Sequence, residues 1–385
     1  MPAVKKVCII TTIPFTMRAF VLDTAIHLHN NGGFDVTLIC DHDESLATEL
    51  PEGLRYIPVR MRRGVDPAGV VTVLQLMRVF LRERFDLVQY STPNASFYAS
   101  IAARLSRVPV RLYAQWGVLY VGFAGVKRRV FRAIERITCA LSTVIQPDSH
   151  GNLKFCVAEG LYARGKGEVV WNGSADGVNL GVFDITRKDE WARQVRSSLD
   201  IPQAAVVFGY VGRITRDKGV NELLEAFQSI SQQIPSAYLL MVGDPENVDS
   251  LNRVLFEWAR DEPRVLFTDY VDDSERYFAA MDVFVLPSYR EGFGSVVIEA
   301  SAMGIPVIVT DIPGPTDAVI RDVTGMVVGK QDPADLEQAM ARLASDSELR
   351  KGMGEAGYRH VAANFDHDLM LQHLLENRRR LLELA

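Results

Sequence analysis

Long hydrophobic runs, paired cysteines and metal-binding motifs are all missing from this 385-residue chain. Without about 18 consecutive uncharged apolar residues, a transmembrane helix is not expected. The short apolar start also lacks a small-residue cleavage site, so it is expected to be a first strand rather than a signal peptide. No Cys-x-x-Cys or His-Glu-x-x-His occurs, which argues against zinc sites. The cysteines are expected to be reduced core residues of a cytoplasmic protein: Cys8, Cys40, Cys139 and Cys156.

Repeats and low-complexity tracts are absent too, which excludes solenoids and disordered arrays. What remains is an ordinary globular composition, with 48% hydrophobic and 23% charged residues. A chain of this length exceeds one ordinary core, so two domains are expected.

The charge is distributed unevenly along the chain. Residues 1–180 hold 21 Lys and Arg against 15 Asp and Glu, whereas residues 181–385 hold 21 against 33. Basic residues of the first half can contact anionic lipid at a membrane or a diphosphate-bearing acceptor, although a solvated helix face explains each patch equally well. Nucleic acid is not an expected partner because no aromatics are interleaved. The patches are Arg60, Arg62 and Arg63, then Lys127–Arg129 with Arg132 and Arg136.

Apolar runs alternate with amphipathic stretches, which indicates parallel sheets covered by helices, an α/β fold. A loop rich in Gly, Asn and Asp over residues 171–181 marks the expected boundary between two doubly wound domains. Ligands bind at the strand C-termini of such sheets. Strands are predicted at residues 6–11, 34–40, 55–59, 86–90, 110–114 and 143–146, then at 206–211, 238–242, 265–267, 283–286, 306–309 and 327–328.

The first candidate site is a basic turn after an apolar strand. Residues 209–219 read GYVGRITRDKG, with Arg213 and Lys218 following the strand. Glycine lets backbone approach an anion, a guanidinium grips phosphate in a fork, and an ammonium adds a compact charge. This pattern predicts a diphosphate site. A basic turn paired with acids such as Asp217 and Glu222 would give the same pattern.

The second candidate site carries two carboxylates at the start of a helix. Glu291 opens a tight Glu-Gly-Phe-Gly turn, and Glu299 lies one turn into the helix that begins at Ser295. The helix start offers N–H groups and a positive dipole end to a phosphate. Two carboxylates would not bind the phosphate itself, but they can accept hydrogen bonds from sugar hydroxyls. Glu299 is therefore expected to accept the hydroxyls of the ribose, and Glu291 those of a transferred hexose. Two solvated helix acids are the alternative.

Together these residues resemble the family-4 retaining glycosyltransferases of the GT-B fold. The family pattern is Gly-Arg-x4-Lys-Gly, then Pro-Ser-x2-Glu-Gly-Phe-Gly with Glu-x7-Glu, and residues 300–314 resemble its bacterial capsule, exopolysaccharide and O-antigen branch. In this chain the pattern is carried by Gly212, Arg213, Lys218, Gly219, Pro287, Ser288, Glu291, Gly292, Phe293, Gly294 and Glu299.

The resemblance implies two Rossmann-like domains facing across a cleft. Residues 1–180 would bind the acceptor and residues 181–366 the nucleotide sugar, with the helix 367–385 crossing back to the first domain. In a front-face mechanism the leaving phosphate oxygen takes the acceptor proton while side-chain cations absorb the charge. Neither a metal nor another cofactor would then be needed.

Individual roles follow from the same resemblance. Arg213, Lys218 and Glu291 are the catalytic candidates, and the nucleotide base would lie near Tyr270. The implied donor-binding residues are Gly212, Gly243, Tyr270, Val271, Gly292, Phe293, Gly294, Ser295 and Glu299.

The acceptor side is less strongly marked. Many family members have His-Gly after the fifth strand, where this chain has Gln115, Trp116 and Gly117. Trp116 and Tyr120 either stack on an acceptor or pack in the core, and His150 is expected in a loop. The Asp-His-Asp stretch 41–43 lies in a charged loop, where no metal is expected. The acceptor-side candidates are Thr12, Trp116, Gly117, His150 and Asn172.

The sequence thus predicts a retaining glycosyltransferase that moves a hexose or N-acetylhexosamine from a nucleotide sugar, with UDP favoured. The acceptor would be a lipid-linked saccharide, in particular one on polyprenyl diphosphate, or a soluble one, at the cytoplasmic face of the cell membrane. An epimerase or phosphorylase of the same fold would require acid/base groups or a cofactor lysine that are not evident. A non-catalytic glycan-binding partner would have no need of Arg213, Lys218, Glu291 and Glu299.

Overall fold

The computed structural model describes residues 4–61 and 69–384, and the chain divides into two compact units. Unit 1 contains the chain up to Asp176 and the segment from Asp368 onward, and unit 2 contains Gly177–His367. The boundary predicted after residue 180 lies four residues beyond the first of these divisions. Each unit has its own sheet and its own hydrophobic core.

Unit 1 is built on a parallel six-stranded sheet with the order β3-β2-β1-β4-β5-β6. Apart from the edge strand β3, its strands are mostly apolar and buried on both faces, as a parallel sheet covered by two helical layers requires. Ile9 lies opposite Leu38 on one side and Gln89 on the other. The strand order reverses between β1 and β4, a topological switch point. The strands are β1 (Lys6–Ile10), β2 (Asp35–Cys40), β3 (Arg55–Pro58), β4 (Leu87–Tyr90), β5 (Val110–Gln115) and β6 (Val144–Pro147).

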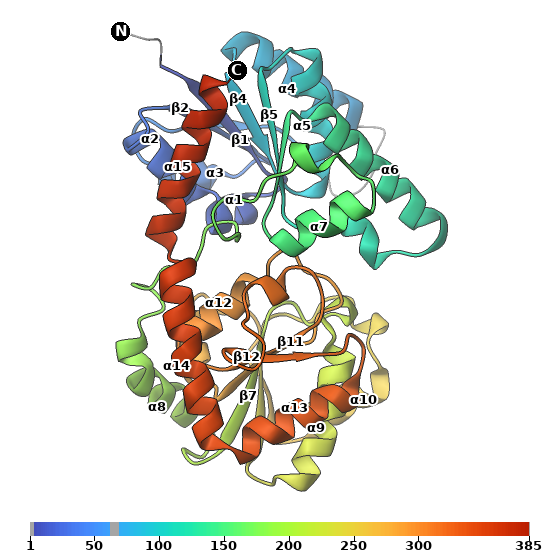
Figure 1. Cartoon of the computed structure of the whole chain (residues 1–385), viewed down its shortest axis with the longest axis vertical. Helices are drawn as coiled ribbons and strands as arrows, with labels where there is room; N and C mark the ends of the chain where they lie inside the picture. The colour runs from blue at the N-terminus through green and yellow to red at the C-terminus, as the bar shows by residue number, and fades with distance from the viewer. Residues whose placement is uncertain (1–3, 62–68, 385) are drawn as a thin grey trace. The chain divides into compact units, whose positions relative to one another are not determined.

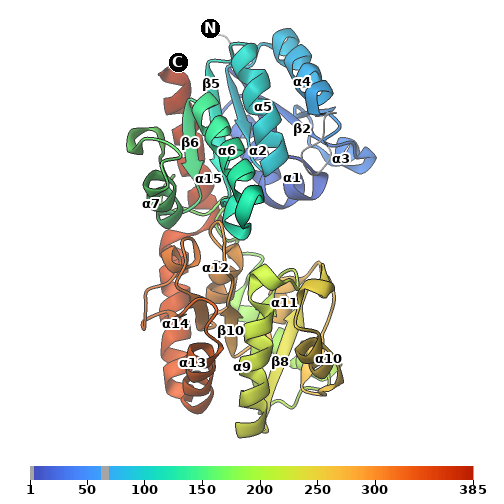
Figure 2. The same ribbon diagram turned by 90° about the vertical axis from the view of Figure 1, so that its right-hand side faces the viewer.

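Helices cover both faces of this sheet because successive strand side chains point to opposite sides. Cys8 and Ile10 pack into a core shared with α4, α5, α6 and α7, whereas Val7 and Ile9 pack into a second core with α1, α2, α3 and α15 (Figures 1 and 2). The helices are α1 (Pro14–Phe20), α2 (Leu22–Asn30), α3 (Glu44–Glu49), α4 (Gly69–Glu83), α5 (Pro93–Leu105), α6 (Gly125–Leu141), α7 (His150–Ala158) and α15 (His367–Glu383).

Unit 2 repeats this architecture with the strand order β12-β11-β10-β7-β8-β9, again all parallel. Its buried residues form one continuous core. The strands are β7 (Val206–Val211), β8 (Ala237–Val242), β9 (Val265–Phe267), β10 (Val283–Leu286), β11 (Val307–Thr310) and β12 (Gly325–Val328).

Two helical layers also sandwich the sheet of unit 2. Helix α9 contacts both α10 and α13, whereas α11 contacts α8 and α12, and α12 contacts α14 (Figures 1 and 2). The helices are α8 (Lys188–Ser198), α9 (Val220–Gln233), α10 (Arg253–Asp261), α11 (Ser274–Ala279), α12 (Ser295–Ala302), α13 (Pro333–Ser345) and α14 (Ser347–Asn364).

The predicted strands match the observed ones to within one residue at each end, apart from β12. That edge strand begins two residues earlier than predicted, at Gly325, which pairs with Val307. A Cβ atom at Gly325 would lie 2.4 Å from the carbonyl oxygen of Val307, so only glycine fits there without a shift. The four cysteines are buried and free, as predicted.

Candidate functional site

The candidate donor residues of unit 2 lie at the carboxyl edge of its sheet. Gly212 follows β7, Gly243 follows β8 and Pro287 follows β10. Because β7 pairs in parallel with both β8 and β10, these three strand ends are neighbours. Gly243 has φ +127°, and a Cβ atom there would lie 2.2 Å from the carbonyl oxygen of Gly212. Glycine is therefore required where the first two loops touch.

Lys218 and Glu291, predicted from separate motifs, form an ion pair. Lys218 Nζ lies 2.6 Å from Glu291 Oε1, and only 21% and 11% of the two side chains are exposed. The Ser288 hydroxyl donates to the same carboxylate oxygen at 2.7 Å. Gly219 makes the approach possible: it has φ +73°, and a Cβ atom there would lie 2.0 Å from the carbonyl oxygen of Pro287. A cation and a carboxylate thus share one half-buried spot at the end of β10.

Arg213, in contrast, is held only at the surface. Its guanidinium donates to Glu246 Oε2 at 2.9 Å, and about half of each side chain is exposed. The Tyr210 hydroxyl donates to the backbone carbonyl of Arg213 at 2.7 Å and so fixes the turn but not the guanidinium. Exposed ion pairs contribute little, up to about 1 kcal/mol, so an anionic ligand can replace Glu246 at low cost.

The acids suggested as alternative partners of these cations, Asp217 and Glu222, form their hydrogen bonds with other residues, although the charge of Asp217 still interacts with those of Arg213 and Lys218. Asp217 accepts from Arg290 at 2.6 Å, and Glu222 accepts from the Tyr289 hydroxyl at 2.6 Å. Burial and Glu222 together raise the pKa of Tyr289 to about 12. Arg290 and Tyr289 occupy the two variable positions of the Pro-Ser-x2-Glu motif, where the motif itself gives no signal for them. Their contacts hold the turn after β10 against the basic turn after β7.

Glu299 lies in α12, and its carboxylate has no partner. In the part of the chain that the structure describes, no side chain or backbone group hydrogen-bonds to it. Burial alone raises its pKa to about 7. A carboxylate desolvated in this way can still accept hydrogen bonds from a ligand's hydroxyls, which would lower that pKa again.

The turn before α12 presents backbone rather than side chains. The Phe293 ring is buried and packs on Phe365 at 5.3 Å between ring centroids, so it is a core residue. Gly294 has φ +86° and precedes Ser295, and no side chain caps the helix start. The first N–H groups of α12 are thus available to an anion. The preceding Gly292 is only partly buried.

The loop after β9 is tied to the loop after β8. The Tyr270 backbone N–H donates to Asp244 Oδ1 at 3.0 Å, and the Gly243 N–H donates to the Asp269 carbonyl at 2.8 Å. The Tyr270 ring is 56% exposed, whereas Val271 packs against the core of unit 2. An exposed aromatic ring on a fixed backbone is a suitable surface for a nucleotide base.

The acceptor-side candidates of unit 1 fall into two groups. Thr12 and Thr92, at the ends of β1 and β4, join their hydroxyls at 2.7 Å across the switch point. Trp116 packs on Phe20 with 5.9 Å between centroids, next to Gly117, which has φ +88°. The remaining two candidates are Asn172, in a turn, and His150.

One of the unit 1 expectations needs correction, and one of the alternatives left open is decided. His150 is the exposed first residue of α7, with Ser149 as its N-cap, and not a loop residue. Tyr120 is a core residue whose hydroxyl donates to Glu159 at 3.1 Å, so it is not available to stack on a sugar. The Ser-His-Gly stretch hid a helix start because serine at an N-cap and serine in a loop look alike in sequence.

The Asp-His-Asp stretch has a structural role at Asp43. Its carboxylate caps α3 by accepting from the Leu46 N–H at 3.0 Å, and it pairs with Arg18 at 3.0 Å. Within residues 4–61 and 69–384, no three His, Cys, Asp or Glu side chains are grouped closely enough to hold a metal.

A polar cluster around Arg378 escaped the sequence analysis. Its guanidinium is 2% exposed and donates to Gln89 Oε1 at 2.9 Å, Gln146 Oε1 at 2.8 Å and Asn377 Oδ1 at 2.6 Å. Burial lowers the pKa of Arg378 to about 10. The cluster borders a cavity of about 30 Å³ that Trp116 also lines. In sequence, Arg378 looks like one of three solvated arginines at the end of the chain.

The geometry can be set beside known proteins. Residues 192–360 match the family described as glycosyl transferases group 1, and residues 7–149 match glycosyl transferase 4-like proteins. The chain is 29% identical to the capsular polysaccharide biosynthesis glycosyltransferase CapM of Staphylococcus aureus, over 88% of each chain. It is 26% identical to an Escherichia coli UDP-Gal:alpha-D-GlcNAc-diphosphoundecaprenol alpha-1,3-galactosyltransferase, over 83% of this chain and 82% of that one.

Similarity to solved structures covers the fold. Sucrose-phosphate synthase from Thermosynechococcus elongatus superposes with a TM-score of 0.80 over 99% of this chain and all of that one, at 21% identity. Such a likeness at low identity shows that both chains share the GT-B architecture of two Rossmann-like domains.

Proposed function

Because this chain belongs to the group 1 glycosyl transferases, with the family-4 motifs in place, we propose that it transfers a hexose or N-acetylhexosamine from a UDP-sugar to a saccharide acceptor. The observation that carries the proposal is the ion pair of Lys218 and Glu291 at the carboxyl edge of the unit 2 sheet. The uncapped start of α12 and the unpartnered Glu299 follow within the same stretch of chain.

The donor would occupy this edge in a defined way. The N–H groups at the start of α12, with Lys218 and Arg213, bind the diphosphate, and Glu299 accepts the ribose hydroxyls. Glu291 accepts a hexose hydroxyl while Ser288 holds its carboxylate. UDP and a diphosphate-linked lipid acceptor are supported by the name of the Escherichia coli relative, and a role in surface polysaccharide synthesis by that of the Staphylococcus relative.

Transfer would proceed with retention at the anomeric carbon and without a metal. As the bond from that carbon to the diphosphate breaks, the departing phosphate oxygen takes the proton of the attacking acceptor hydroxyl on the same face. Lys218 and Arg213 stabilise the negative charge that develops on the diphosphate, which is the largest contribution such a site makes. The two cations thereby supply the charge that a divalent ion supplies elsewhere.

The direct test is a panel of UDP- and GDP-sugars incubated with the protein in EDTA, without an acceptor. Binding is followed by ligand-observed NMR, and nucleotide release is followed by chromatography. In a second step an acceptor is added, and the anomer of the product is determined by proton NMR. One UDP-sugar should bind and hydrolyse slowly. If no sugar nucleotide binds, the donor site is wrongly assigned. An inverted product would refute retention, and activity that returns only with a divalent ion would refute metal independence.

Glu299 makes donor binding pH-dependent. The proposed ribose contact requires the carboxylate, and with a pKa of about 7 this group is mostly protonated at pH 6 in the free protein. We expect affinity for the UDP-sugar to rise about tenfold from pH 6 to pH 8, since only the ionised form binds well. Calorimetry checks this, and a UDP-sugar, unlike UDP, has no phosphate group that titrates in this range.

The matched variant for that experiment is Glu299→Gln, which keeps the shape and loses the titration. Its affinity should be weaker at pH 8 and flat across the range. An equally flat profile in the unaltered protein would show that Glu299 does not touch the donor.

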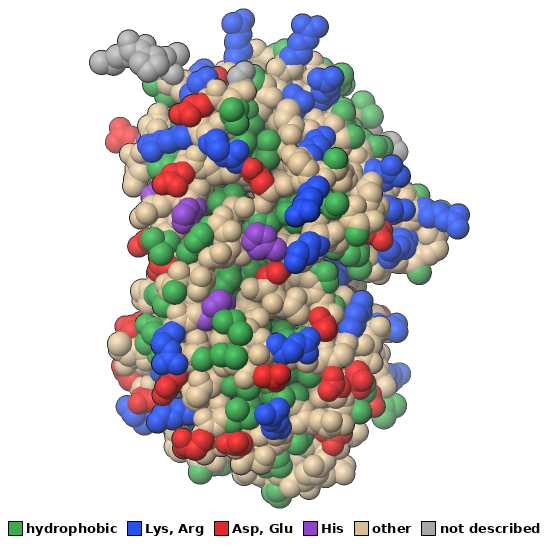
Figure 3. All heavy atoms as spheres, viewed as in Figure 1, with side chains coloured by type: hydrophobic (Ala, Val, Ile, Leu, Met, Phe, Trp, Pro, Cys, Tyr) green, Lys and Arg blue, Asp and Glu red, His purple; other side chains and the backbone are tan. Residues whose placement is uncertain are grey.

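Unit 1 carries a surface suited to anionic lipid, and we propose that α6 contacts the membrane there. Val126, Val130 and Ile137 are 73%, 47% and 45% exposed, with exposed Arg129 and Arg136 on the same face of the helix. Figure 3 shows Lys and Arg side chains gathered where Figure 1 places α6. Exposed apolar residues flanked by cations are typical of helices that lie in a bilayer interface.

The patch of Arg60, Arg62 and Arg63 gives less support to the proposed membrane contact. Arg60 is exposed, whereas Arg62 and Arg63 lie outside the described residues. No helix in residues 4–61 and 69–384 is both long and apolar enough to span a bilayer.

We expect a Val126→Asp/Val130→Asp double variant to bind phosphatidylglycerol vesicles at least about tenfold more weakly than the unaltered protein, because each change removes buried apolar area and adds repulsion. Vesicle sedimentation measures this. A Val254→Asp variant is the control, because Val254 is 76% exposed but lies on α10 of unit 2. Equal binding by all three proteins would exclude α6 as the contact.

A further inference from the structure

Unit 2 has a second hollow, at the opposite edge of its sheet from the candidate donor site. Asp282 directly precedes β10 and Pro306 directly precedes β11, and both line the hollow. Because β10 and β11 run parallel, this is the amino edge of the sheet. The cavity volume is about 520 Å³, within the range of small-molecule sites.

Helix α14 forms one wall, in direct contact with the turn between α12 and β11. A Cβ atom at Gly354 would lie 2.3 Å from the carbonyl oxygen of Gly304, so the helix backbone rests on that turn. The opposite wall is the start of α8, which brings Lys188 to the same turn. The Gly304 turn therefore joins the two walls, through a backbone contact with α14 and a side-chain hydrogen bond from α8.

The charged side chains around the hollow are mainly basic. Arg350, Lys351 and Arg359 line it from α14 and Lys188 from α8, against Asp282 and Glu355. Asp282 is already neutralised, because its carboxylate accepts from Arg196 at 2.9 Å. An excess of positive charge remains.

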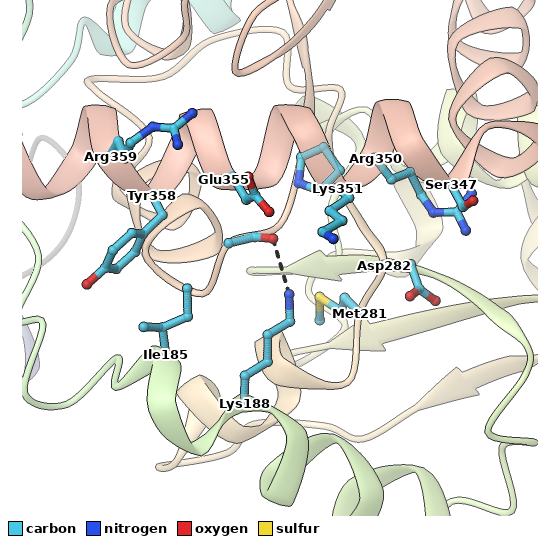
Figure 4. A pocket seen from close by; sticks show the side chains of 12 residues that line it. Ile185, Lys188, Met281, Asp282, Ser347, Arg350, Lys351, Glu355, Tyr358 and Arg359 are labelled. Carbon is cyan, nitrogen blue, oxygen red and sulfur yellow. Dashed lines mark hydrogen bonds between the residues drawn. The ribbon is translucent and has the colours of Figure 1, made fainter.

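Two lysines enter the hollow from opposite walls, as Figure 4 shows for Lys188 and Lys351. Among the described residues, Lys188 Nζ donates to one group, the Gly304 carbonyl at 3.1 Å, and burial lowers the pKa of Lys188. Lys351 makes no ion pair or hydrogen bond with any side chain in residues 4–61 and 69–384. Both ammonium groups thus keep N–H donors for a ligand.

A purely structural role, in which Lys188 caps the end of α12, explains its bond to Gly304. That role does not explain why Lys351 has no side-chain partner among the described residues, or why cations are in excess around a cavity.

We propose that this hollow binds the phosphate group of a small hydroxylated molecule, a phosphate monoester, between Lys188 and Lys351. Ammonium groups are effective phosphate ligands, and the cavity exceeds the volume of the phosphate alone. The Glu355 carboxylate, which has no ion-pair or hydrogen-bond partner in the part of the chain that the structure describes, lines the same hollow and can accept a hydroxyl of the molecule. The inference is independent of the proposed donor.

The test is calorimetric titration of the full chain with inorganic phosphate and, separately, with glucose 1-phosphate. We expect saturable binding at one site with a dissociation constant of about 1 mM or tighter. Lys351→Met should weaken phosphate binding about tenfold, because it removes one of the two ammonium groups proposed to hold the phosphate. Since Lys351 is exposed, its loss should leave the fold intact. Arg342→Met removes the same charge from the exposed end of α13 and should leave binding unchanged.

Lys218→Met separates this hollow from the donor site. Binding that persists in Lys218→Met and is lost in Lys351→Met supports the proposal, and tighter binding of the sugar phosphate than of inorganic phosphate identifies a hydroxylated ligand. Equal affinity would mean that the phosphate alone is recognised and would overturn the role of Glu355. Binding lost in Lys218→Met, binding insensitive to Lys351→Met, or no saturable binding would each overturn the site.

Discussion

The Lys218→Met variant is expected to lose sugar transfer almost entirely while remaining folded. Lys218 Nζ is 2.6 Å from Glu291 and sits where the leaving diphosphate is proposed to develop charge. Removal of one such preorganised donor from a transfer site lowers kcat by about 10²–10³-fold. The measurement is initial rate against donor concentration, with the UDP-sugar identified by the panel.

Folding should be affected far less than catalysis. Without Lys218, Glu291 keeps the hydrogen bond from Ser288 and contact with water, so the loss of stability is about 1–2 kcal/mol. Arg342→Met is the control: it removes an exposed cation from the last turn of α13 in the same unit and should leave kcat within about twofold. If Lys218→Met retained more than about a tenth of the activity, charge stabilisation by this side chain would not be the basis of catalysis.

Arg378→Met is expected to be the most destabilising of these single changes, at about 3 kcal/mol or more. It removes the donor that satisfies the buried amide oxygens of Gln89 and Gln146 and leaves them unpaired. Each buried polar group left without a partner costs about 1–3 kcal/mol. Denaturant unfolding, followed by tryptophan fluorescence, gives the free energy of unfolding.

The neighbouring Arg379 provides the control, because it is exposed and, within residues 4–61 and 69–384, donates to a single group, the Asn31 carbonyl at 3.0 Å. Arg379→Met should change stability by about 0.5 kcal/mol or less. Arg378→Lys should fall between the two, since an ammonium keeps the charge but cannot reach both glutamines as the planar fork does. Equal stability of Arg378→Met and Arg379→Met would show that the cluster adds nothing to the fold.

The sheets were predictable from sequence because their strands are short apolar runs buried on both faces. Strand ends such as Val211 and Leu286 are followed at once by glycine or proline, which punctuate the pattern. Helix α14 was harder to predict, because Gly352, Gly354 and Gly357 interrupt its helical pattern. Gly354 is there for contact with the Gly304 turn, a tertiary requirement that no local pattern records.

For the candidate site, too, the residues could be predicted from local motifs, whereas their tertiary contacts could not. Motif spacing indicated that Lys218 and Glu291 belong to one site, yet it could not show that they bind each other. That pairing depends on the left-handed Gly219 bringing one loop against another. Arg378 gave no signal, because burial of an arginine depends on which strands its helix covers.

The return of α15 to unit 1 has a consequence for how the chain folds as it is made. Leu375, Leu381 and Leu382 fill a core whose other members are encoded before residue 113, and Arg378 bonds to strands β4 and β6. During synthesis the first unit therefore leaves the ribosome with an open apolar face, and it can close only after all of unit 2 has been translated. The domain whose synthesis starts first is therefore completed last, and until then the part of its apolar core that α15 covers stays open.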